Sequence, residues 1–452
     1  MALKFLAEDR RSSVAVVGFG YVGSCIGATL AERGLRVVGV DSDPVLVTEM
    51  AAGHCRFNEP GLAALISAAV ASGTLTLTGD YSQVSTADVI IIAVATPVDE
   101  QRQIQTAHLE SACSSLAPHL RPGQLVIVKS TVSPGTTRLL VRPALEKGGL
   151  EQGRDFGLAF CPERLAEGNA LAQFRSVPIV VGGCDDESAA AARSFWSGVL
   201  DVEVVSFAGP DAAEMVKLAD NWWIDANIAL ANELAKLCGA LDIDVLDVIA
   251  GANSLPKGSS FVNVLLPSVG VGGSCLTKDP WILWSTGQRH GLDLQLARTG
   301  REVNDSMPDY ASRLLLTELA ALGKDPARAK IAVLGLAFKN NTNDLRRTPV
   351  LPVVHALRES CRTVTIYDPL VTAEQARAMF GLEQSASLAE AVQDADCVAV
   401  LAGHDSLRDL DLPDLAGRVS MPCLIFDGRA YYSRPVIDQM RGLGFAYRGI
   451  GR

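Results

Sequence analysis

The stretch that decides the fold is SSVAVVGFGYVGSCIGATLAERGLRVVGVD, Ser12 to Asp41. Its short apolar run Val14–Val17 predicts a buried strand, and three closely spaced glycines follow it. A helical pattern then continues as far as Gly34, which is typical of a helix end. Leu35–Val40 predicts a second buried strand. The stretch therefore predicts a β-α-β unit.

The glycines form the pattern G-x-G-x-x-G at Gly18, Gly20 and Gly23. After a strand and before a helix, this pattern is typical of dinucleotide binding. Gly18 permits the tight turn, Gly20 lets a pyrophosphate approach the backbone, and Gly23 allows close helix packing. The helix N-terminus offers N–H donors to phosphate. Asp41, after the second strand, is placed to bind a ribose 2′-hydroxyl, which favours NAD over NADP. A glycine turn without a ligand is the alternative interpretation.

The same alternation of strands and helices occurs in two parts of the chain, one before and one after a long helical stretch. Between the two α/β patterns, Asp211 to about Leu241 lacks Gly and Pro until Gly239 and predicts one long helix. A second α/β pattern begins near Lys330. We expect an α/β fold with two Rossmann-like, doubly wound lobes joined by a long central helix. Further strands of the first lobe are expected at Val89–Val94, Leu125–Val128, Leu158–Phe160 and Ile179–Val181.

This pattern predicts three regions. Residues 1–208 form an N-terminal NAD-binding Rossmann domain, 209–310 a central helical linker and dimerisation region, and 311–452 a C-terminal Rossmann-like domain. The apolar content of the central helix suggests burial against a second copy, hence a homodimer.

Composition excludes several classes of protein. The chain has 452 residues, 48% hydrophobic and 20% charged, with a formal net charge of −11. Nucleic acid and anionic membranes are therefore not expected as partners. The ten cysteines show no C-x-x-C pair and the six histidines no metal-ligand spacing, so we expect reduced thiols and no metal. The N-terminal MALKFLAEDRRSS lacks a long apolar core and no run reaches 18 apolar residues, which favours a soluble, cytoplasmic protein without a signal peptide.

An unusual cysteine lies in VGVGGSCLTKDP, Val269 to Pro280. Most cysteines are small buried residues, but Cys275 follows a glycine cluster, which lets a ligand approach the backbone. Asp279 and Pro280 are typical of an N-cap and a first helical position, so the cysteine should lie in the loop before a helix. Lys278 or the helix field would favour the thiolate. Asp279 is either a cap or a carboxylate within reach of the sulfur.

Other polar residues allow two interpretations each. Lys217 and Asn221 are four residues apart on the predicted long helix and share a face, but a solvated lysine with a polar neighbour fits equally well. Glu163 and Glu167 in CPERLAEGNAL, and the polar loop STVSPGTT at 130–137, are equally ambiguous. Residue chemistry alone does not join these pieces into one site.

Taken together and in order, the motifs resemble the nucleotide-sugar 6-dehydrogenases, the UDP-glucose / UDP-N-acetylmannosamine / GDP-mannose dehydrogenase family. The resemblance covers nearly the whole chain. It is carried by VGFGYVG, TPVDE (96–100), KSTVSPGTT, CPERLAEG, the 217–221 helix with IALANELAKLCGALDID, GVGGSCLTKDP, GLAFKNNTNDLR, YDP and DGR.

The resemblance implies a four-electron oxidation of a sugar C6 alcohol to a carboxylate with two NAD. It implies that Cys275 attacks the intermediate aldehyde to give a thiohemiacetal, which is oxidised to a thioester and hydrolysed. Lys217 and Asn221 would stabilise the developing oxyanion. Asp279 would act with Lys217 on the water or the alcohol proton, and Glu163 would be the base in thioester hydrolysis.

The resemblance implies further contacts. Thr131 would position a water or the substrate hydroxyl, and Glu167 would contact the cofactor. Lys339 would contact the sugar nucleotide from the second lobe, with Arg346 and Arg429 as candidates for the same pocket. The active site is expected in a cleft between the lobes. The implied cofactor-binding set is Gly18, Gly20, Tyr21, Val22, Gly23, Asp41, Thr96, Thr131 and Glu167, and the implied substrate-binding set is Glu163, Lys217, Asn221, Gly272, Lys339, Arg346 and Arg429.

Departures from the family pattern bear on the sugar. Thr277 replaces a proline, Asn343 replaces an aspartate, and Trp222-Trp223 follow Asn221. CPER and the Asp-Pro-Trp after the cysteine resemble N-acetylhexosamine members, whereas Lys278-Asp279 and FKNNT resemble glucose members. We expect a UDP- or dTDP-glucose-type substrate, with a UDP-N-acetylhexosamine as the alternative. The product would serve polysaccharide synthesis or secondary-metabolite glycosylation.

Two other classes of function are compatible with part of the pattern. A two-electron β-hydroxyacid or alcohol dehydrogenase would share the first lobe but would not require Cys275. A sugar-nucleotide sensor without catalysis would bind a ligand but transfer no hydride. The set of Lys217, Asn221, Cys275 and Asp279 argues against the sensor.

Overall fold

The computed structural model describes residues 12–452 of the chain. These residues form two compact units, residues 12–220 with 281–292 and residues 221–280 with 293–452. Of the stretch 1–13, on which the expectation about a signal peptide rests, residues 1–11 lie outside the described residues. No helix within the described residues is both long and apolar enough to span a bilayer.

The first unit contains an eight-stranded sheet in the order β3-β2-β1-β4-β5-β6-β7-β8. The first six of these strands are parallel and in the order of a dinucleotide-binding fold, β7 runs antiparallel to β6, and β8 is parallel to β7. The strands are β1 (Ser13–Val17), β2 (Arg36–Val40), β3 (Leu75–Thr78), β4 (Val89–Ile92), β5 (Leu125–Val128), β6 (Gly157–Phe160), β7 (Ile179–Gly183) and β8 (Val204–Phe207).

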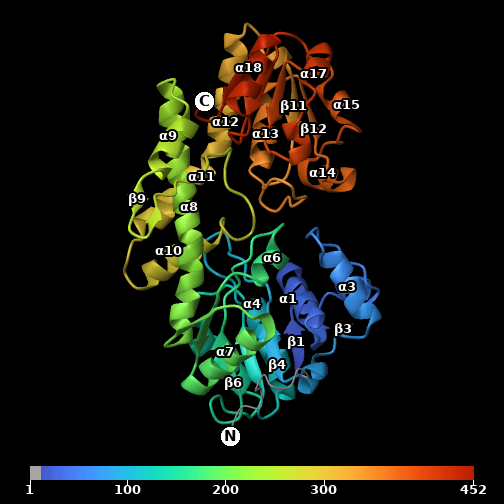
Figure 1. The fold of residues 1–452 in the computed structure, drawn as a ribbon, viewed down its shortest axis with the longest axis vertical. Coiled ribbons are helices and arrows are strands. Elements are labelled where there is room, and N and C mark those ends of the chain that lie inside the picture. Colours follow the sequence, from blue (N-terminus) through green and yellow to red (C-terminus); the bar gives the residue numbers. More distant parts are fainter. Residues whose placement is uncertain (1–11) are drawn as a thin grey trace. The chain divides into compact units, whose positions relative to one another are not determined.

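Alternate residues of the first sheet belong to different cores. Val14 and Val16 of β1 pack in one hydrophobic cluster with α1, α3, α6 and α7, whereas Ala15 and Val17 pack in another with α4 and α5. Helices therefore cover both faces, as expected for a doubly wound sheet (Figure 1). The helices are α1 (Tyr21–Glu32), α2 (Pro44–Ala51), α3 (Leu62–Ala71), α4 (Ala107–Leu116), α5 (Arg142–Glu146), α6 (Ala170–Phe174) and α7 (Asp186–Leu200).

The second unit contains a five-stranded parallel sheet in the order β12-β11-β13-β14-β15. It too is covered on both faces, by α12, α13 and α14 on one side and α15, α17 and α18 on the other. The strands, with the hairpin β9-β10, are β9 (Pro256–Lys257), β10 (Ser260–Phe261), β11 (Lys330–Leu334), β12 (Thr363–Tyr367), β13 (Cys397–Val400), β14 (Leu424–Asp427) and β15 (Ala446–Gly449). The helices are α9 (Val245–Asn253), α11 (Gln295–Asp305), α12 (Met307–Ala321), α13 (Val350–Ser360), α14 (Ala373–Phe380), α15 (Leu388–Val392), α16 (Asp405–Arg408), α17 (Leu412–Arg418) and α18 (Arg434–Gly442).

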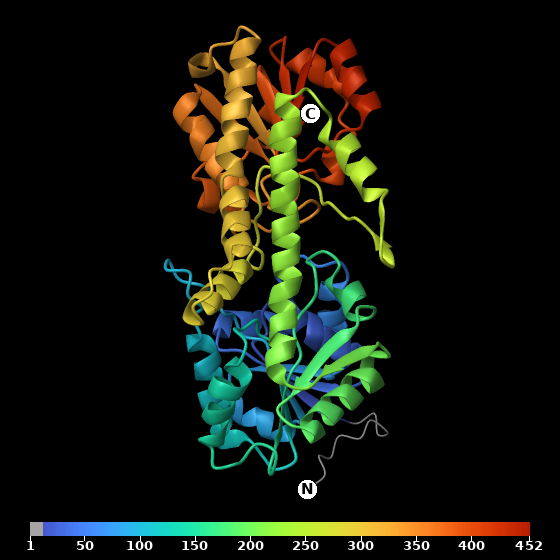
Figure 2. The same cartoon turned by 90° about the vertical axis from the view of Figure 1, so that its left-hand side faces the viewer.

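The predicted long helix is α8, which runs without interruption over Pro210–Ala240 (Figure 2). It starts in the first unit, and its residues from Asn221 onwards belong to the second. The helix before which Cys275 was expected to lie is α10 (Asp279–Arg289). The prediction of an α/β fold with two doubly wound sheets and a long central helix is confirmed.

A buried carboxylate near the start of α8 binds the loop after β5. Glu214 is fully buried, and its carboxylate oxygens accept hydrogen bonds from Gly135 N at 2.6 Å and from Thr137 N at 2.8 Å. Burial outweighs these hydrogen bonds and raises the pKa of Glu214 to about 7.

Glu214→Gln should therefore change how stability depends on pH. The folded-state pKa lies above the unfolded one, so the folded protein binds the proton more tightly and wild-type stability falls as the pH rises from about 4.5 through 7. The neutral glutamine is free of this effect. We expect the Tm of the wild type, relative to Glu214→Gln, to fall by several degrees between pH 5 and pH 8 in scanning calorimetry. Glu203→Gln, at an exposed glutamate, is the control. A difference between wild type and Glu214→Gln that stays constant with pH would contradict the account.

Candidate active site

The glycine turn after β1 has the geometry that its sequence predicts. Gly18 has a φ of +86°, and its N–H donates to Val40 O at 2.9 Å. A Cβ on Gly23 would lie 1.9 Å from the carbonyl oxygen of Gly18, so only glycine lets α1 pack against the turn. A Cβ on Gly20, by contrast, would meet no atom within 4 Å. Open space at the N-terminus of α1 suits a bound pyrophosphate.

Asp41 lies directly after β2, beside the glycine turn. One of its carboxylate oxygens accepts a hydrogen bond from Phe19 N at 2.6 Å, and the other accepts one from Asp43 N at 2.9 Å. Each oxygen keeps a further lone pair, so the carboxylate can also accept hydroxyl groups of a ribose. Together with the open space at Gly20, this geometry fits NAD.

Two other predicted cofactor residues, Tyr21 and Glu167, lie close to a residue that the sequence did not reveal. Tyr21 and Val22 begin α1 and are partly exposed. The hydroxyl of Tyr21 donates to the buried Glu59 at 2.5 Å, and Gly168 N donates to the same carboxylate oxygen at 2.7 Å. Burial and this hydrogen bond raise the pKa of Tyr21 well above its usual range. Glu59 thus connects α1 with the loop that carries Glu167, and no sequence pattern marks it.

Glu163 lies in the loop after β6. It is nearly buried, and one carboxylate oxygen accepts hydrogen bonds from Arg164 N at 2.6 Å and Leu165 N at 2.8 Å. The other oxygen has no hydrogen-bond partner and lies 3.8 Å from the ammonium of Lys129. The free oxygen is compatible with a base that binds a water molecule.

Lys129 is the first residue of the motif KSTVSPGTT, and the sequence predicted no role for it. It lies just after β5 and is 2% exposed. Its ammonium donates to Cys161 O at 3.2 Å and Pro162 O at 3.4 Å and lies 4.9 Å from the Trp196 ring centroid. Lys129 therefore fixes the start of the loop that carries Glu163. A lysine that ends an apolar strand was the available signal.

Thr96 and Thr131 lie together in the first unit. Thr96 is buried, and its hydroxyl donates to Thr131 O at 2.6 Å. Lys217 is also buried in this unit, one helical turn before Asn221 on α8. Asn221 is already assigned to the second unit.

In the second unit, Cys275 is exposed, and among the cysteines of residues 12–452 it alone is so. Its carbonyl oxygen accepts hydrogen bonds from Lys278 N at 3.0 Å and Asp279 N at 2.9 Å. The cysteine therefore lies at the start of α10, as predicted, where the helix field is positive.

Asp279 is the first residue of α10 and is fully buried. One of its carboxylate oxygens accepts a short hydrogen bond from the Asn221 amide, and the other lies 2.5 Å from the ammonium of Lys278. The Asp279 side chain thus bonds to side chains of the candidate site, which favours the functional interpretation over a simple cap. Lys278 pairs with this carboxylate.

The glycines before Cys275 make room for protein atoms. A Cβ on Gly272 would lie 2.4 Å from Cβ of Phe338, and one on Gly273 would lie 2.8 Å from the Phe338 ring. Phe338 and Pro349 occupy the space that a side chain at Gly272 would need, so these glycines allow close packing of protein atoms. A substrate contact of Gly272 stays a prediction.

The remaining predicted substrate residues lie at or near the carboxyl ends of the second sheet. Lys339 is partly exposed, and Arg346 is exposed and paired with Asp344 at 2.5 Å. Arg429 donates to Leu401 O at 2.8 Å and to Phe338 O at 2.6 Å, and burial lowers its pKa to about 10. Its guanidinium is thus engaged in holding the loop around Phe338. Residues 12–452 contain no group of three or more His, Cys, Asp and Glu that could hold a metal ion.

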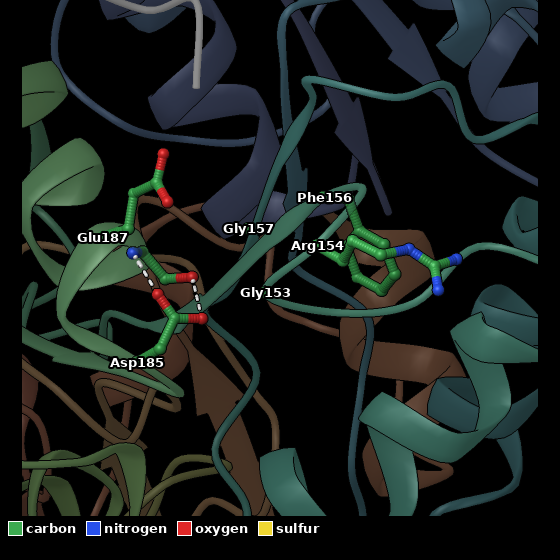
Figure 3. Close-up of a pocket in the computed structure, with 7 residues that line it drawn as sticks. Gly153, Arg154, Phe156, Gly157, Asp185 and Glu187 are labelled. Carbon is green, nitrogen blue, oxygen red and sulfur yellow. Dashed lines mark hydrogen bonds between the residues drawn. The ribbon is translucent and has the colours of Figure 1, made fainter. Parts of the chain in front are cut away.

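A small pocket at Gly153, Phe156 and Asp185 is not a candidate (Figure 3). It lies at the amino-terminal end of β6, whereas the glycine turn follows the carboxyl end of the parallel strand β1. The Asp185 carboxylate accepts from Ser188 N at 2.7 Å and from the Ser188 hydroxyl at 2.9 Å, and so caps α7.

Comparison with known proteins identifies the class of this protein. The fold and the glycine turn are those of a dinucleotide-binding protein, and three family models match in order. They are described as the NAD binding domain (residues 12–199), the central domain (211–306) and the UDP binding domain (332–434) of the UDP-glucose/GDP-mannose dehydrogenase family. The chain belongs to this family and is an NAD-dependent nucleotide-sugar 6-dehydrogenase.

Similar proteins include several that act on N-acetylated sugars. The UDP-N-acetyl-D-mannosamine dehydrogenase of Pyrococcus horikoshii is 32% identical over 439 residues, 97% of this chain and 99% of that protein. Its solved structure has a TM-score of 0.88. The NDP-N-acetyl-D-galactosaminuronic acid dehydrogenase of Ralstonia nicotianae is 33% identical over 93% of this chain and 96% of its own. The structure of a UDP-glucose dehydrogenase from Pyrobaculum islandicum is 30% identical, covers 98% of both chains and has a TM-score of 0.85.

The two glycines of the turn should respond differently to alanine. Gly23→Ala puts a methyl group into the Gly18 carbonyl and should lower the Tm by at least 5 °C. Gly20→Ala meets no protein atom, so its Tm should stay within 2 °C of the wild type while the Kd for NAD rises at least tenfold. Calorimetry and NAD titration measure both. Unchanged NAD affinity in folded Gly20→Ala would contradict the assigned pyrophosphate position.

Proposed function

We propose that this protein oxidises the C6 alcohol of a UDP-N-acetylhexosamine to the uronic acid in two NAD-dependent steps, with Cys275 as the covalent nucleophile. The observation that carries the proposal is the exposed Cys275 just before α10, whose carbonyl oxygen accepts the backbone N–H of Asp279, the buried carboxylate held by Asn221. A two-electron alcohol dehydrogenase needs no such thiol.

Two oxidations and one hydrolysis convert the alcohol to the acid. In the first oxidation, the C6 alcohol loses a hydride and a proton and becomes an aldehyde. The Cys275 thiolate adds to the aldehyde carbon, and the oxygen is protonated to give a thiohemiacetal. Loss of a second hydride and a proton gives a thioester. Water then breaks the carbon–sulfur bond, releasing the carboxylic acid and the thiol. Bound NAD supplies the acceptor for the hydride in each oxidation.

Other residues of the chain would stabilise the charge at C6, transfer protons and activate the hydrolytic water. The Asn221 amide donates one N–H to Asp279 and has a second to offer to an oxyanion at C6, and the ammonium of Lys217 would stabilise the same charge. Asp279, with Lys217, would handle the proton of the alcohol. Glu163, with one carboxylate oxygen free of hydrogen bonds, would activate the hydrolytic water, and Thr131 would orient it.

The relatives support an N-acetylated sugar over the glucose-type sugar that the sequence favoured. Both curated relatives described above carry an N-acetylated sugar in their names, UDP-N-acetyl-D-mannosamine in one and an NDP-N-acetyl-D-galactosaminuronic acid in the other. A UDP- or dTDP-glucose remains the second candidate. It is favoured by Lys278-Asp279, by the FKNNT stretch and by the likeness to the Pyrobaculum islandicum UDP-glucose dehydrogenase structure.

The amount of NADH formed per sugar consumed tests both parts of the proposal. The panel is UDP-N-acetylmannosamine, UDP-N-acetylglucosamine, UDP-glucose, dTDP-glucose and GDP-mannose, followed at 340 nm with product mass determined in parallel. We expect two NADH per sugar, with the highest kcat/KM for a UDP-N-acetylhexosamine. One NADH per sugar would contradict the thioester route. Two NADH with a glucose substrate alone would keep the route and replace the sugar.

We also propose that the protein is a homodimer that pairs through α8. Trp223, Leu230 and Leu237 are 52%, 49% and 58% exposed in the single chain. Their spacing of seven residues places them in one apolar stripe along the helix, and Leu241 extends it. A second copy of the same helix is a self-complementary partner for such a stripe.

Leu230→Glu/Leu237→Glu should therefore give a monomer, because two charges would be buried in the contact. Light scattering at micromolar concentration should report about twice the chain mass for the wild type and a single chain mass for the variant. His355→Glu, exposed on α13, is the matched control and should remain a dimer. A wild-type monomer would contradict the proposal.

A further inference from the structure

A buried ion pair joins α11 to α8 within the second unit. Arg301 is 1% exposed and Asp225 is fully buried. Nη1 of Arg301 donates to Oδ1 of Asp225 at 2.6 Å, and Nη2 pairs with Asp305. Asp225 lies one helical turn after Asn221, so the two residues project from the same face of α8.

Polar groups extend the pair towards the loop that carries Cys275. The amide of Asn304 donates to Oδ1 of Asp225 at 2.8 Å and to its carbonyl oxygen at 2.9 Å. The amide of Asn232 donates to Asn304 Oδ1 at 2.9 Å and accepts from Ser268 N at 2.9 Å. Ser268 stands at the start of the segment that leads to the cysteine.

Arg301 also contacts that loop directly. Its Nη1 donates to the carbonyl oxygen of Leu276, the residue after Cys275, at 3.4 Å. On the far side of the loop, Asn221 donates to Asp279. Two residues on successive turns of α8 therefore hold the segment 276–279. Asn221 binds Asp279 directly, and Asp225 acts on Leu276 through Arg301.

Stability alone gives no good reason for this pair. Desolvating two charges is costly, and well-packed apolar residues of similar volume are often at least as stabilising. The pair is also imperfectly satisfied, because Oδ2 of Asp225 and Nε of Arg301 have no hydrogen-bond partner. Burial raises the pKa of Asp225, and Arg301 only partly offsets this effect. What an apolar pair could not supply is the directed hydrogen bond to Leu276.

We propose that the Asp225–Arg301 pair is a positioning device for the nucleophile, which fixes the backbone of residues 275–276 and thereby the direction of the Cys275 thiol. The inference rests on the proposed role of Cys275. Neither residue is assigned a contact with substrate or cofactor. Their effect on the reaction is exerted through the Leu276 carbonyl.

The first test replaces the pair with apolar residues of similar size, Asp225→Leu/Arg301→Met. We expect a folded protein with a Tm within 5 °C of the wild type, a kcat at least tenfold lower and a KM for the sugar nucleotide within threefold. Iodoacetamide alkylation of Cys275, followed by peptide mass spectrometry without substrate, should slow at least fivefold, because the thiol no longer holds its place at the start of α10. A purely structural pair would leave both kcat and alkylation unchanged.

Arg301→Lys is the second variant, in case the double variant does not fold. Lysine keeps the charge opposite Asp225 but lacks the planar fork that also reaches Leu276. We expect its kcat to fall between those of the wild type and the double variant. Lys324→Met/Asp396→Asn removes another partly buried ion pair of the same unit, at 2.7 Å, and should leave kcat and alkylation unchanged.

The outcomes separate this inference from the proposed function. A folded double variant, or an Arg301→Lys variant, with wild-type kcat and wild-type alkylation of Cys275 overturns the inference. If Cys275→Ser retains two NADH per sugar, the proposed function fails, while the alkylation rates still report whether the pair orients the thiol.

Discussion

The hydrogen bond from Asn221 to Asp279 is the contact on which the rest of the candidate site depends. It joins the long helix α8 to the first residue of α10, and Cys275 lies four residues before that point. The carbonyl oxygen of the cysteine accepts two N–H groups of the same helix start. A reactive thiol on a glycine-rich loop would otherwise sample many positions. Here the helix start that follows the thiol is tied to the 31-residue helix α8.

The two sheets use the same turn with different outcomes. Gly18 and Gly335 both have a positive φ, and the next N–H in each turn donates to an aspartate after the second strand, Phe19 to Asp41 and Leu336 to Asp368, at 2.6 Å in both. The sequence predicts the same alternation of strands and helices in both lobes. The shared hydrogen bond shows that the repeat extends to turn chemistry.

What differs is access to the aspartate. Asp41 is partly exposed, whereas Asp368 is 1% exposed and lies 3.0 Å from Nε2 of His404. Burial would raise the pKa of Asp368, but the hydrogen bond from His404 and two backbone N–H groups hold it below its usual value. Nδ1 of His404 accepts from Asn341 N at 2.8 Å, in the loop that follows Lys339. The second turn thus uses its aspartate to fix a loop, while the first leaves it open to a ribose.

The fold could be predicted from the sequence because its signals are local. The strand β1, the glycine turn and the strand β2 were each marked by residues within a short stretch, and α8 by the absence of helix breakers. Glu59 and Arg301 could not be found this way, and Lys129 had only the weak signal of a lysine at the end of an apolar strand. Each acts through partners distant in sequence, as Arg301 does with Asp225, 76 residues away. The packing of Phe338 against Gly272 and Gly273 is likewise a contact between residues distant in sequence.

The measurement that tests the central claim most directly is the NADH formed per sugar by Cys275→Ser, with Cys55→Ser, at a partly exposed cysteine, as the control. The account predicts that Cys275→Ser forms at most one NADH per sugar in the time that the wild type needs for one turnover, because no thioester can form. Cys55→Ser should form two. Two NADH per sugar at the wild-type rate from Cys275→Ser would contradict the account.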